Sequence, residues 1–90
     1  MTTTLVVRHK VNDYAGWRAV YESLEPLRAK HGCTAARVLQ LSADSNDVLI
    51  THDFGTSEQA VSFAGDPELQ VGMQRAGVAG PPLIEIFAVA

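Results

Sequence analysis

The sequence lacks most of the features that would assign it to a specialised class of protein. It has one cysteine, Cys33, which excludes an internal disulfide framework and a zinc site built from several cysteines. No apolar run approaches the ~20 residues that span a bilayer, and the N-terminus has no signal-peptide pattern. The sequence has 7 Lys and Arg against 10 Asp and Glu. These basic residues are too few and too scattered to bind nucleic acid. We therefore expect a cytoplasmic protein that binds neither membranes nor nucleic acid.

Nucleotide-binding and nucleophile motifs are also missing. The sequence contains no glycine-rich phosphate loop, no dinucleotide fingerprint and no Gly-x-Ser-x-Gly elbow. The stretch from Gly77 to Pro82 is not a phosphate cradle, because its prolines remove the amide donors that a cradle uses. We expect no bound cofactor.

What is present fits one small folded unit. The chain has 90 residues, of which 47% are apolar, and we expect a single domain over residues 1–90. A domain of this size buries only ~60% of its unfolded surface, so association with another subunit is a common source of added stability.

Hydrophobic patterning predicts four strands and helices between them. The order is strand, helix, strand, strand, helix, strand, with the second helical region interrupted around Gly65. The predicted strands are Thr3–Val11, Thr34–Leu41, Asp47–Phe54 and Leu83–Val89, and the predicted helical regions are Tyr14–His31, Ser57–Phe63 and a segment from Pro67 to Met73 or Arg75.

The first helical region is amphipathic. Its apolar stripe consists of Trp17, Val20, Tyr21, Leu24 and Leu27. Its polar residues are expected to face away from the sheet: Arg18, Glu22, Glu25 and Arg28. Pro26 should kink or divide this helix, because it removes a backbone hydrogen bond. The expected N-caps of the first and second helical regions are Asp13 and Ser57.

This order is the split βαβ arrangement of an α+β, ferredoxin-like fold, with the first and third strands in the centre of an antiparallel sheet. Helices can cover only one face of such a sheet. The strands nevertheless carry apolar residues on both faces, so we expect a second copy of the chain to cover the other face. The predicted assembly is a face-to-face homodimer.

Several short segments resemble the antibiotic biosynthesis monooxygenase-like family of dimeric α+β barrel proteins. They are Arg8-His9-Lys10-Val11 with Asp13-Tyr14 and Trp17, then Thr51-His52-Asp53-Phe54 with the helix Ser57–Phe63, and the Gly-Pro-Pro before the last strand. The resemblance covers essentially the whole chain. It implies a dimeric α+β barrel, and the family includes cofactor-free monooxygenases of polyphenolic substrates, haem-degrading enzymes, isomerases and cyclases. A shared scaffold does not by itself specify the reaction.

Four polar residues lie within apolar strands, where an unpaired polar group is costly to bury. They are His9, His52, Arg37 and Glu85. If Thr3 pairs with Phe54, the two histidines are four residues apart along the strands, or ~13 Å. They therefore cannot share one metal ion within a subunit, and no metal site is expected.

The same register predicts that six residues point to one face and line an apolar cavity for a small aromatic ligand: His9, His52, Arg37, Glu85, Phe54 and Phe87. The aromatic wall of that cavity would be Trp17 and Tyr21. A slip of one residue would move a whole strand's set to the other face. Each residue also has a structural interpretation: partly exposed histidines, edge-strand charges and aromatic core packing.

Three functions remain open. The first is a cofactor-independent monooxygenase, or a related isomerase or cyclase, acting on a small aromatic or polyketide-like molecule. In it His52 would be the base, and Arg37, His9 or Tyr21 would stabilise the anion. The second is a non-catalytic, small-molecule-binding or stress-associated dimer, and the third is a purely structural dimer. Haem binding is a weaker variant of the first, because the family's haem ligand lies on a helix whereas His9 and His52 lie on strands.

Overall fold

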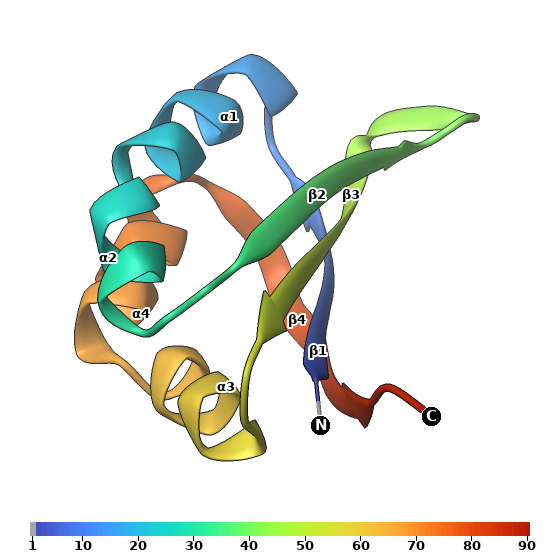
Figure 1. Ribbon diagram of the computed structural model, residues 1–90. Coiled ribbons are helices and arrows are strands. Elements are labelled where there is room, and N and C mark those ends of the chain that lie inside the picture. The colour runs from blue at the N-terminus through green and yellow to red at the C-terminus, as the bar shows by residue number, and fades with distance from the viewer. Residues whose placement is uncertain (1) are drawn as a thin grey trace.

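The computed structural model describes residues 2–90 as two layers, a four-stranded sheet and four helices on one side of it (Figure 1). The elements in chain order are β1 (Thr3–Val11), α1 (Tyr14–Ser23), α2 (Glu25–Lys30), β2 (Ala35–Leu41), β3 (Asp44–Phe54), α3 (Ser57–Ala64), α4 (Pro67–Arg75) and β4 (Val78–Ala88).

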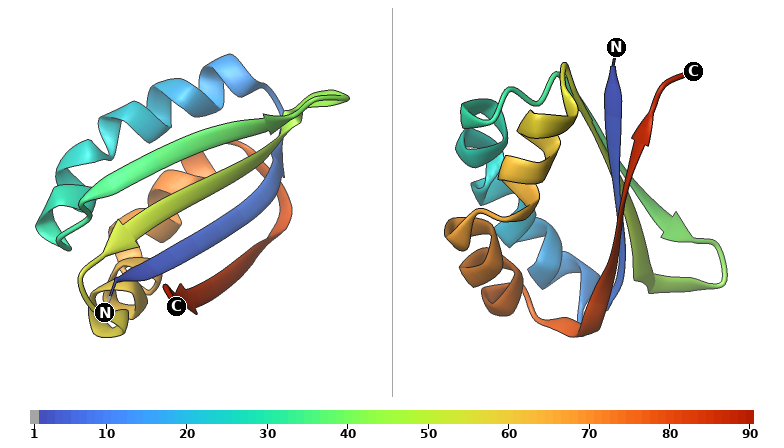
Figure 2. Two further views of the ribbon diagram at one scale, coloured as in Figure 1. Left: turned by 45° about the vertical axis from the view of Figure 1, so that its right-hand side comes forward. Right: turned by 90° about the horizontal axis from the view of Figure 1, so that it is seen from below.

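The sheet has the strand order β2-β3-β1-β4, and every neighbouring pair is antiparallel. This confirms the predicted α+β, ferredoxin-like arrangement with β1 and β3 in the centre. Figure 2 shows that all four helices lie against the same face of the sheet, while the opposite face is uncovered. We call these the helix face and the open face.

The pairing of β1 with β3 decides which side chains reach the helices. Thr3 pairs with Phe54 and Leu5 with His52, as the sequence predicted. In β1 the residues of odd number are buried and those of even number are half-buried or exposed. The helix face therefore receives Thr3, Leu5, Val7, His9 and Val11 from the first strand.

Between β1 and β2, Pro26 divides the helical region as expected. The helix α1 ends at Ser23 with Leu24 as its C-cap, and α2 begins at Glu25 with Pro26 in its first turn. Proline fits this position because the first backbone N–H groups of a helix have no intrahelical acceptor. The break does not change the face, because Arg28 of α2 lines the same cavity as Trp17 and Tyr21 of α1.

Side-chain caps begin the other helices. The Asp13 carboxylate accepts a hydrogen bond from the Gly16 N–H, as predicted. The predicted cap Ser57 is wrong by one residue: Thr56 caps α3, and its hydroxyl accepts from the Gln59 N–H at 3.2 Å. The Gln59 side chain accepts in turn from the Thr56 N–H, also at 3.2 Å. A Thr-x-x-Gln box pairs two otherwise free N–H groups, which explains the shift.

The core forms where the helix face meets α1, α2 and α3. Its fully buried large side chains are Phe54, Leu5 and Val48, and Trp17, Leu27 and Phe63 pack against them. Phe54 and Phe63 have ring centroids 5.6 Å apart. This core contains no charged pair, so its stability comes from apolar burial.

Two strand boundaries differ from the sequence prediction by more than one residue. The strand β3 begins at Asp44, inside the predicted loop 42–46, and β4 begins at Val78, inside the predicted connector 77–82. Pro81 and Pro82 are accommodated because β4 is an edge strand, where a missing N–H need not break a ladder. Gly77 and Gly80 have φ values of +76° and +84°, a conformation that favours glycine.

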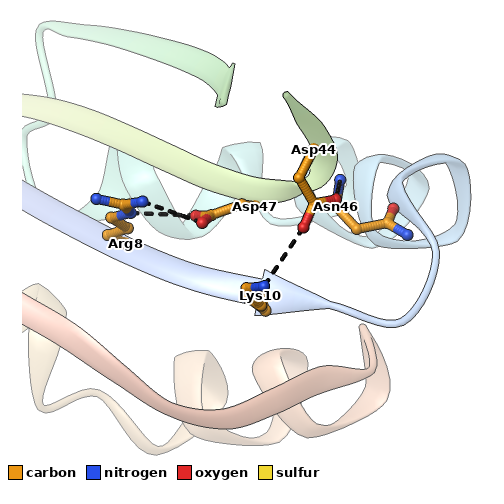
Figure 3. A network of polar contacts seen from close by, with 5 residues as sticks. All are labelled: Arg8, Lys10, Asp44, Asn46 and Asp47. Carbon is orange, nitrogen blue, oxygen red and sulfur yellow. Dashed lines mark hydrogen bonds and ion pairs between the residues drawn. The ribbon is translucent and has the colours of Figure 1, made fainter. Parts of the chain in front are cut away.

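Polar contacts hold the end of the β2–β3 hairpin against β1 (Figure 3). The Arg8 guanidinium donates two hydrogen bonds to the Asp47 carboxylate, at 3.1 and 3.0 Å. Lys10 lies 3.4 Å from Asp44, whose carboxylate also accepts from the Asn46 N–H. These ion pairs lie on the side of the sheet away from the helices.

Candidate functional site

A cavity lies between the helix face and the helices. Its volume is about 50 Å³, and it is lined on the sheet side by Leu5, Val7, Ile50 and the two strand histidines. The outer wall comes from α1, α2, α3 and α4, and Ile84 of the edge strand β4 completes it. Since a cavity of ~150 Å³ is needed to hold benzene, a ring-sized ligand requires flexible wall residues, such as Met73, to move.

The strand register carries both histidines into the helix layer. His9 follows Val7 on the buried parity of β1, and His52 is opposite Leu5 on β3. Their residues are 7% and 4% exposed. The register separates them by four residue pairs, as predicted, so they line different parts of the cavity.

Aromatic residues one helical turn apart on α1 cover these histidines. The Tyr21 hydroxyl lies 3.3 Å from Nε2 of His52. The Trp17 ring stacks on the Tyr21 ring with centroids 5.0 Å apart, and the His9 ring meets Trp17 edge to face at 5.7 Å. The result is a row of rings, His9, Trp17, Tyr21 and His52, along one wall of the cavity.

Both histidines are held neutral. Burial is the main cause that lowers the pKa of His52 to about 4, and the nearby Arg28 cation lowers it further. Burial also lowers the pKa of His9, although the neighbouring Asp47 carboxylate opposes that shift. Burial raises the pKa of the Tyr21 hydroxyl, which therefore keeps its proton. Near neutral pH the wall presents two unprotonated imidazoles.

Three ring nitrogens are buried without a hydrogen-bond partner within residues 2–90. They are Nδ1 and Nε2 of His9 and Nδ1 of His52. Leaving a buried polar group unpaired typically costs ~1–3 kcal/mol. Such groups next to a cavity are typical of sites that complete their hydrogen bonds with a ligand.

Arg28 is a site residue that the sequence analysis placed wrongly. It was expected to face away from the sheet, but it is 7% exposed and lines the cavity. Its Nη1 donates to the Tyr21 carbonyl oxygen at 2.8 Å, and its guanidinium carbon is 4.0 Å from the centre of the Tyr21 ring. Arg28 follows Tyr21 by seven residues and Leu24 by four, which is the spacing of one helix face. That spacing was the signal in the sequence that Arg28 belongs to the apolar stripe despite its charge.

The structure brings four of the predicted site residues together around the cavity. They are His9, His52, Trp17 and Tyr21. Phe54 also points to the helix face, but it is fully buried in the core beside Phe63 and is not part of the cavity wall.

The other three predicted residues lie on the open face, so the expectation of one shared face is wrong for them. Arg37 pairs with Thr51, and Glu85 pairs with Val6. Phe87 pairs with Thr4. Cross-strand partners point to the same side, and these partners have the parity opposite to Leu5 and His52.

The registers of the two edge strands decide these positions. His52 is opposite Ala36 rather than Arg37, and Glu85 is opposite Val6, which has the exposed parity of β1. A difference of one residue in register moves all the side chains of an edge strand to the other face.

The possible metal ligands of the described residues lie apart from one another. Within residues 2–90, no three side chains of the types His, Cys, Asp and Glu gather closely enough to hold a metal ion. His31, outside the cavity, instead makes a 2.7 Å contact with the Asp66 carboxylate.

Known proteins resemble this chain in structure but not detectably in sequence. No protein-family model matches it, and no curated protein does either. A Bordetella bronchiseptica protein named provisionally as an antibiotic biosynthesis monooxygenase superposes with a TM-score of 0.83 at 16% identity, covering 99% of this chain and 97% of that one. SnoaB, a cofactor-independent oxygenase from Streptomyces nogalater, gives 0.81 at 14% identity, covering 99% and 93%.

A Caulobacter crescentus protein with the same provisional name gives a TM-score of 0.78 at 18% identity and covers 99% of this chain and 91% of its own. These similarities define the class by fold: the chain has the ferredoxin-like α+β fold of the antibiotic biosynthesis monooxygenase-like proteins. The resemblance predicted from the sequence is confirmed at that level. Among residues 2–90, none of the helices is long and apolar enough to cross a membrane.

Proposed function

We propose that the chain is a cofactor-independent monooxygenase, or a related isomerase or cyclase, that acts on a small aromatic or polyketide-like molecule in the histidine-lined cavity. The observation that carries this proposal is His52, a buried neutral imidazole that contacts the Tyr21 hydroxyl and borders the cavity. The fold shared with SnoaB, a cofactor-independent oxygenase, supports it.

The proposed reaction begins with proton transfer. A ring nitrogen of His52 takes a proton from an activated CH₂ group of the substrate and leaves a carbanion that the aromatic ring delocalises. The carbanion gives an electron to O₂, the two radicals combine, and loss of water from the hydroperoxide leaves a ketone. The balance is R₂CH₂ + O₂ → R₂C=O + H₂O, so the substrate itself supplies all the electrons.

Oxygen uptake tests this proposal. Dithranol, an anthrone with such a CH₂ group, is mixed with the protein without metal, flavin or nicotinamide. We expect O₂ consumption above the uncatalysed rate, and we expect His52→Asn to reduce it by ~10²-fold or more, the usual contribution of a general base. The matched control is His31→Asn, which changes a histidine outside the cavity and should keep the rate. Equal rates in wild type and His52→Asn would remove His52 from the role of base.

One observation favours a second candidate, a protein that binds a small molecule without transforming it. A pKa of about 4 makes His52 a weak base in the empty cavity, whereas a general base works best with a pKa near the operating pH. In that case an aromatic ligand binds to wild type and to His52→Asn alike, and no product forms under air.

For the open face we propose that a second copy of the chain covers it. Large apolar side chains are exposed there, including Leu39, Leu83 and Phe87, which are 39%, 53% and 51% exposed. Arg37 and Glu85 lie on one cross-strand row, at opposite edges of the sheet. A two-fold axis parallel to the strands places Arg37 opposite Glu85 of the partner subunit. Light scattering should give the mass of two chains, and a stable single chain would contradict this.

A further inference from the structure

We propose that Arg28 gives the cavity a binding site for an anionic oxygen, so that its ligand is an aromatic carboxylate or phenolate. This inference rests on the proposed function, because it assumes that the cavity binds an aromatic molecule. It adds the charge of that ligand and the residue that selects it.

The first observation is that Arg28 is a buried cation without an acidic partner. No carboxylate of residues 2–90 lies within 4.0 Å of its guanidinium. Arg8 and Arg18, which are more exposed, pair with Asp47 at 3.0 Å and Glu22 at 2.7 Å. Burial of an unpaired charge is costly, and a ligand of opposite charge offsets that cost.

The second observation is the unused hydrogen-bonding capacity of Arg28. Its Nη1 donates to the Tyr21 carbonyl oxygen. No hydrogen bond joins its Nε or Nη2 to residues 2–90, and these atoms are not fully enclosed, so a guanidinium with donors suited to bidentate binding of a carboxylate can reach a ligand. The Tyr21 ring face contributes a cation–π contact but accepts no hydrogen bond in the guanidinium plane.

The third observation is the position of Arg28 beside the cavity wall that holds Tyr21 and His52. Arg28 contacts the ring of Tyr21, and the hydroxyl of Tyr21 contacts His52. Leu5, Val7 and Ile50 form the apolar floor of the same cavity. An aromatic ring on this floor can direct an anionic oxygen to Arg28 and present its neighbouring atoms to His52. The proton that His52 accepts would be stabilised by the same negative charge.

The test uses the only tryptophan in the chain, Trp17, as a fluorescent reporter in the cavity wall. Benzoate and benzamide are titrated into the protein, because they match in shape and differ in charge. We expect wild type to bind benzoate about tenfold more tightly, the effect of one hydrogen bond to a charged group. We expect Arg28→Met to abolish that preference, and Arg28→Lys to retain part of it while preserving the charge.

The matched control is Arg18→Met. Arg18 also lies near the Tyr21 ring, at 5.5 Å, but pairs with Glu22 outside the cavity, so the preference should survive its loss. The same titration with pentafluorophenolate and pentafluorobenzene compares a phenolate with its neutral counterpart. Together, the two pairs of compounds distinguish a phenolate ligand from a carboxylate ligand. A preference for either anion that needs Arg28 supports the inference.

Two results would overturn the inference: equal affinity for the charged and neutral compound of both pairs, or a preference that persists in Arg28→Met. If none of the four compounds changes Trp17 fluorescence, the ligand cavity of the proposed function fails as well. If the anions bind through Arg28 but no oxygen is consumed, the inference stands and the oxygenase fails.

Discussion

The two faces of this sheet are built from the same four strands but hold their polar residues in opposite ways. On the open face Arg8 and Asp47 pair across strands, so the buried Asp47 carboxylate has a partner of opposite charge, and Arg8 reaches solvent. On the helix face His9 and His52 are buried, neutral and incompletely hydrogen-bonded. Alternate residues of one strand therefore lie in two different environments, and we propose association for the open face and ligand binding for the helix face.

The largest effect should come from truncating an aromatic side chain on each face. Phe54→Ala removes a fully buried ring from the helix face, and we expect a loss of ~3–5 kcal/mol in the free energy of unfolding. Phe87→Ala removes a ring that is 51% exposed on the open face. We expect it to weaken self-association and to change the stability of the single chain much less. Urea unfolding gives the stability of each variant, and light scattering gives its self-association. Similar losses of stability in the two variants would contradict the difference between the two faces.

The next effect is the pH dependence that His52 imposes. Its pKa is about 4 in the folded protein and near 6.5 when exposed, so the unfolded chain takes up the proton first. Stability is complete above pH 6.5 and falls as pH decreases towards 4, by about 3 kcal/mol in total. His9, whose pKa is also lowered, acts in the same direction. Urea unfolding between pH 7.5 and 4.5 should show the loss, and His52→Gln should reduce it. An unchanged slope would contradict the assignment.

Charge reversal on the open face should have a smaller effect, confined to association. Arg37→Glu or Glu85→Arg alone places like charges across the proposed two-fold interface, and we expect each to weaken the dimer about tenfold. The double variant exchanges the charges and should restore it. Sedimentation at several concentrations gives the dissociation constants. Failure of the double variant to recover would argue against the axis parallel to the strands.

The smallest effect should come from an exposed ion pair near the hairpin end. Lys10 and Asp44 lie 3.4 Å apart, with side chains 65% and 38% exposed. Lys10→Gln should change stability by less than ~0.5 kcal/mol, as is usual for solvated pairs. The difference should vanish in high salt. A loss as large as that of Phe54→Ala would show that the charged network stabilises the fold.

The central pair of strands could be predicted well because the order of the elements places β1 and β3 side by side and antiparallel. With Thr3 opposite Phe54, the separation of His9 from His52 follows from counting residues along the two strands. The edge strands were harder, because a difference of one residue in register moves all their side chains to the other face, and the pairing of each edge strand is interrupted, near Gln40 in β2 and at Gly80-Pro81-Pro82 in β4. Arg37, Glu85 and Phe87 consequently point away from the cavity.

The error at Arg28 has a different origin. Its charge, and not its spacing, grouped it with the solvent-facing residues. Arg28 follows Tyr21 by seven residues and Leu24 by four, which is the spacing of one helix face, and the structure buries it on that face. An arginine on an apolar helix face is itself the signal of a buried cation.

The most direct test of the account is a histidine NMR titration with and without an aromatic acid. We predict that the His52 imidazole stays neutral down to about pH 4, and that its ring signals shift when benzoate is added at neutral pH. Signals that titrate near 6.5 and ignore benzoate would show a solvent-exposed histidine. That result would contradict the claim that the helix face holds a buried, neutral imidazole in a ligand cavity.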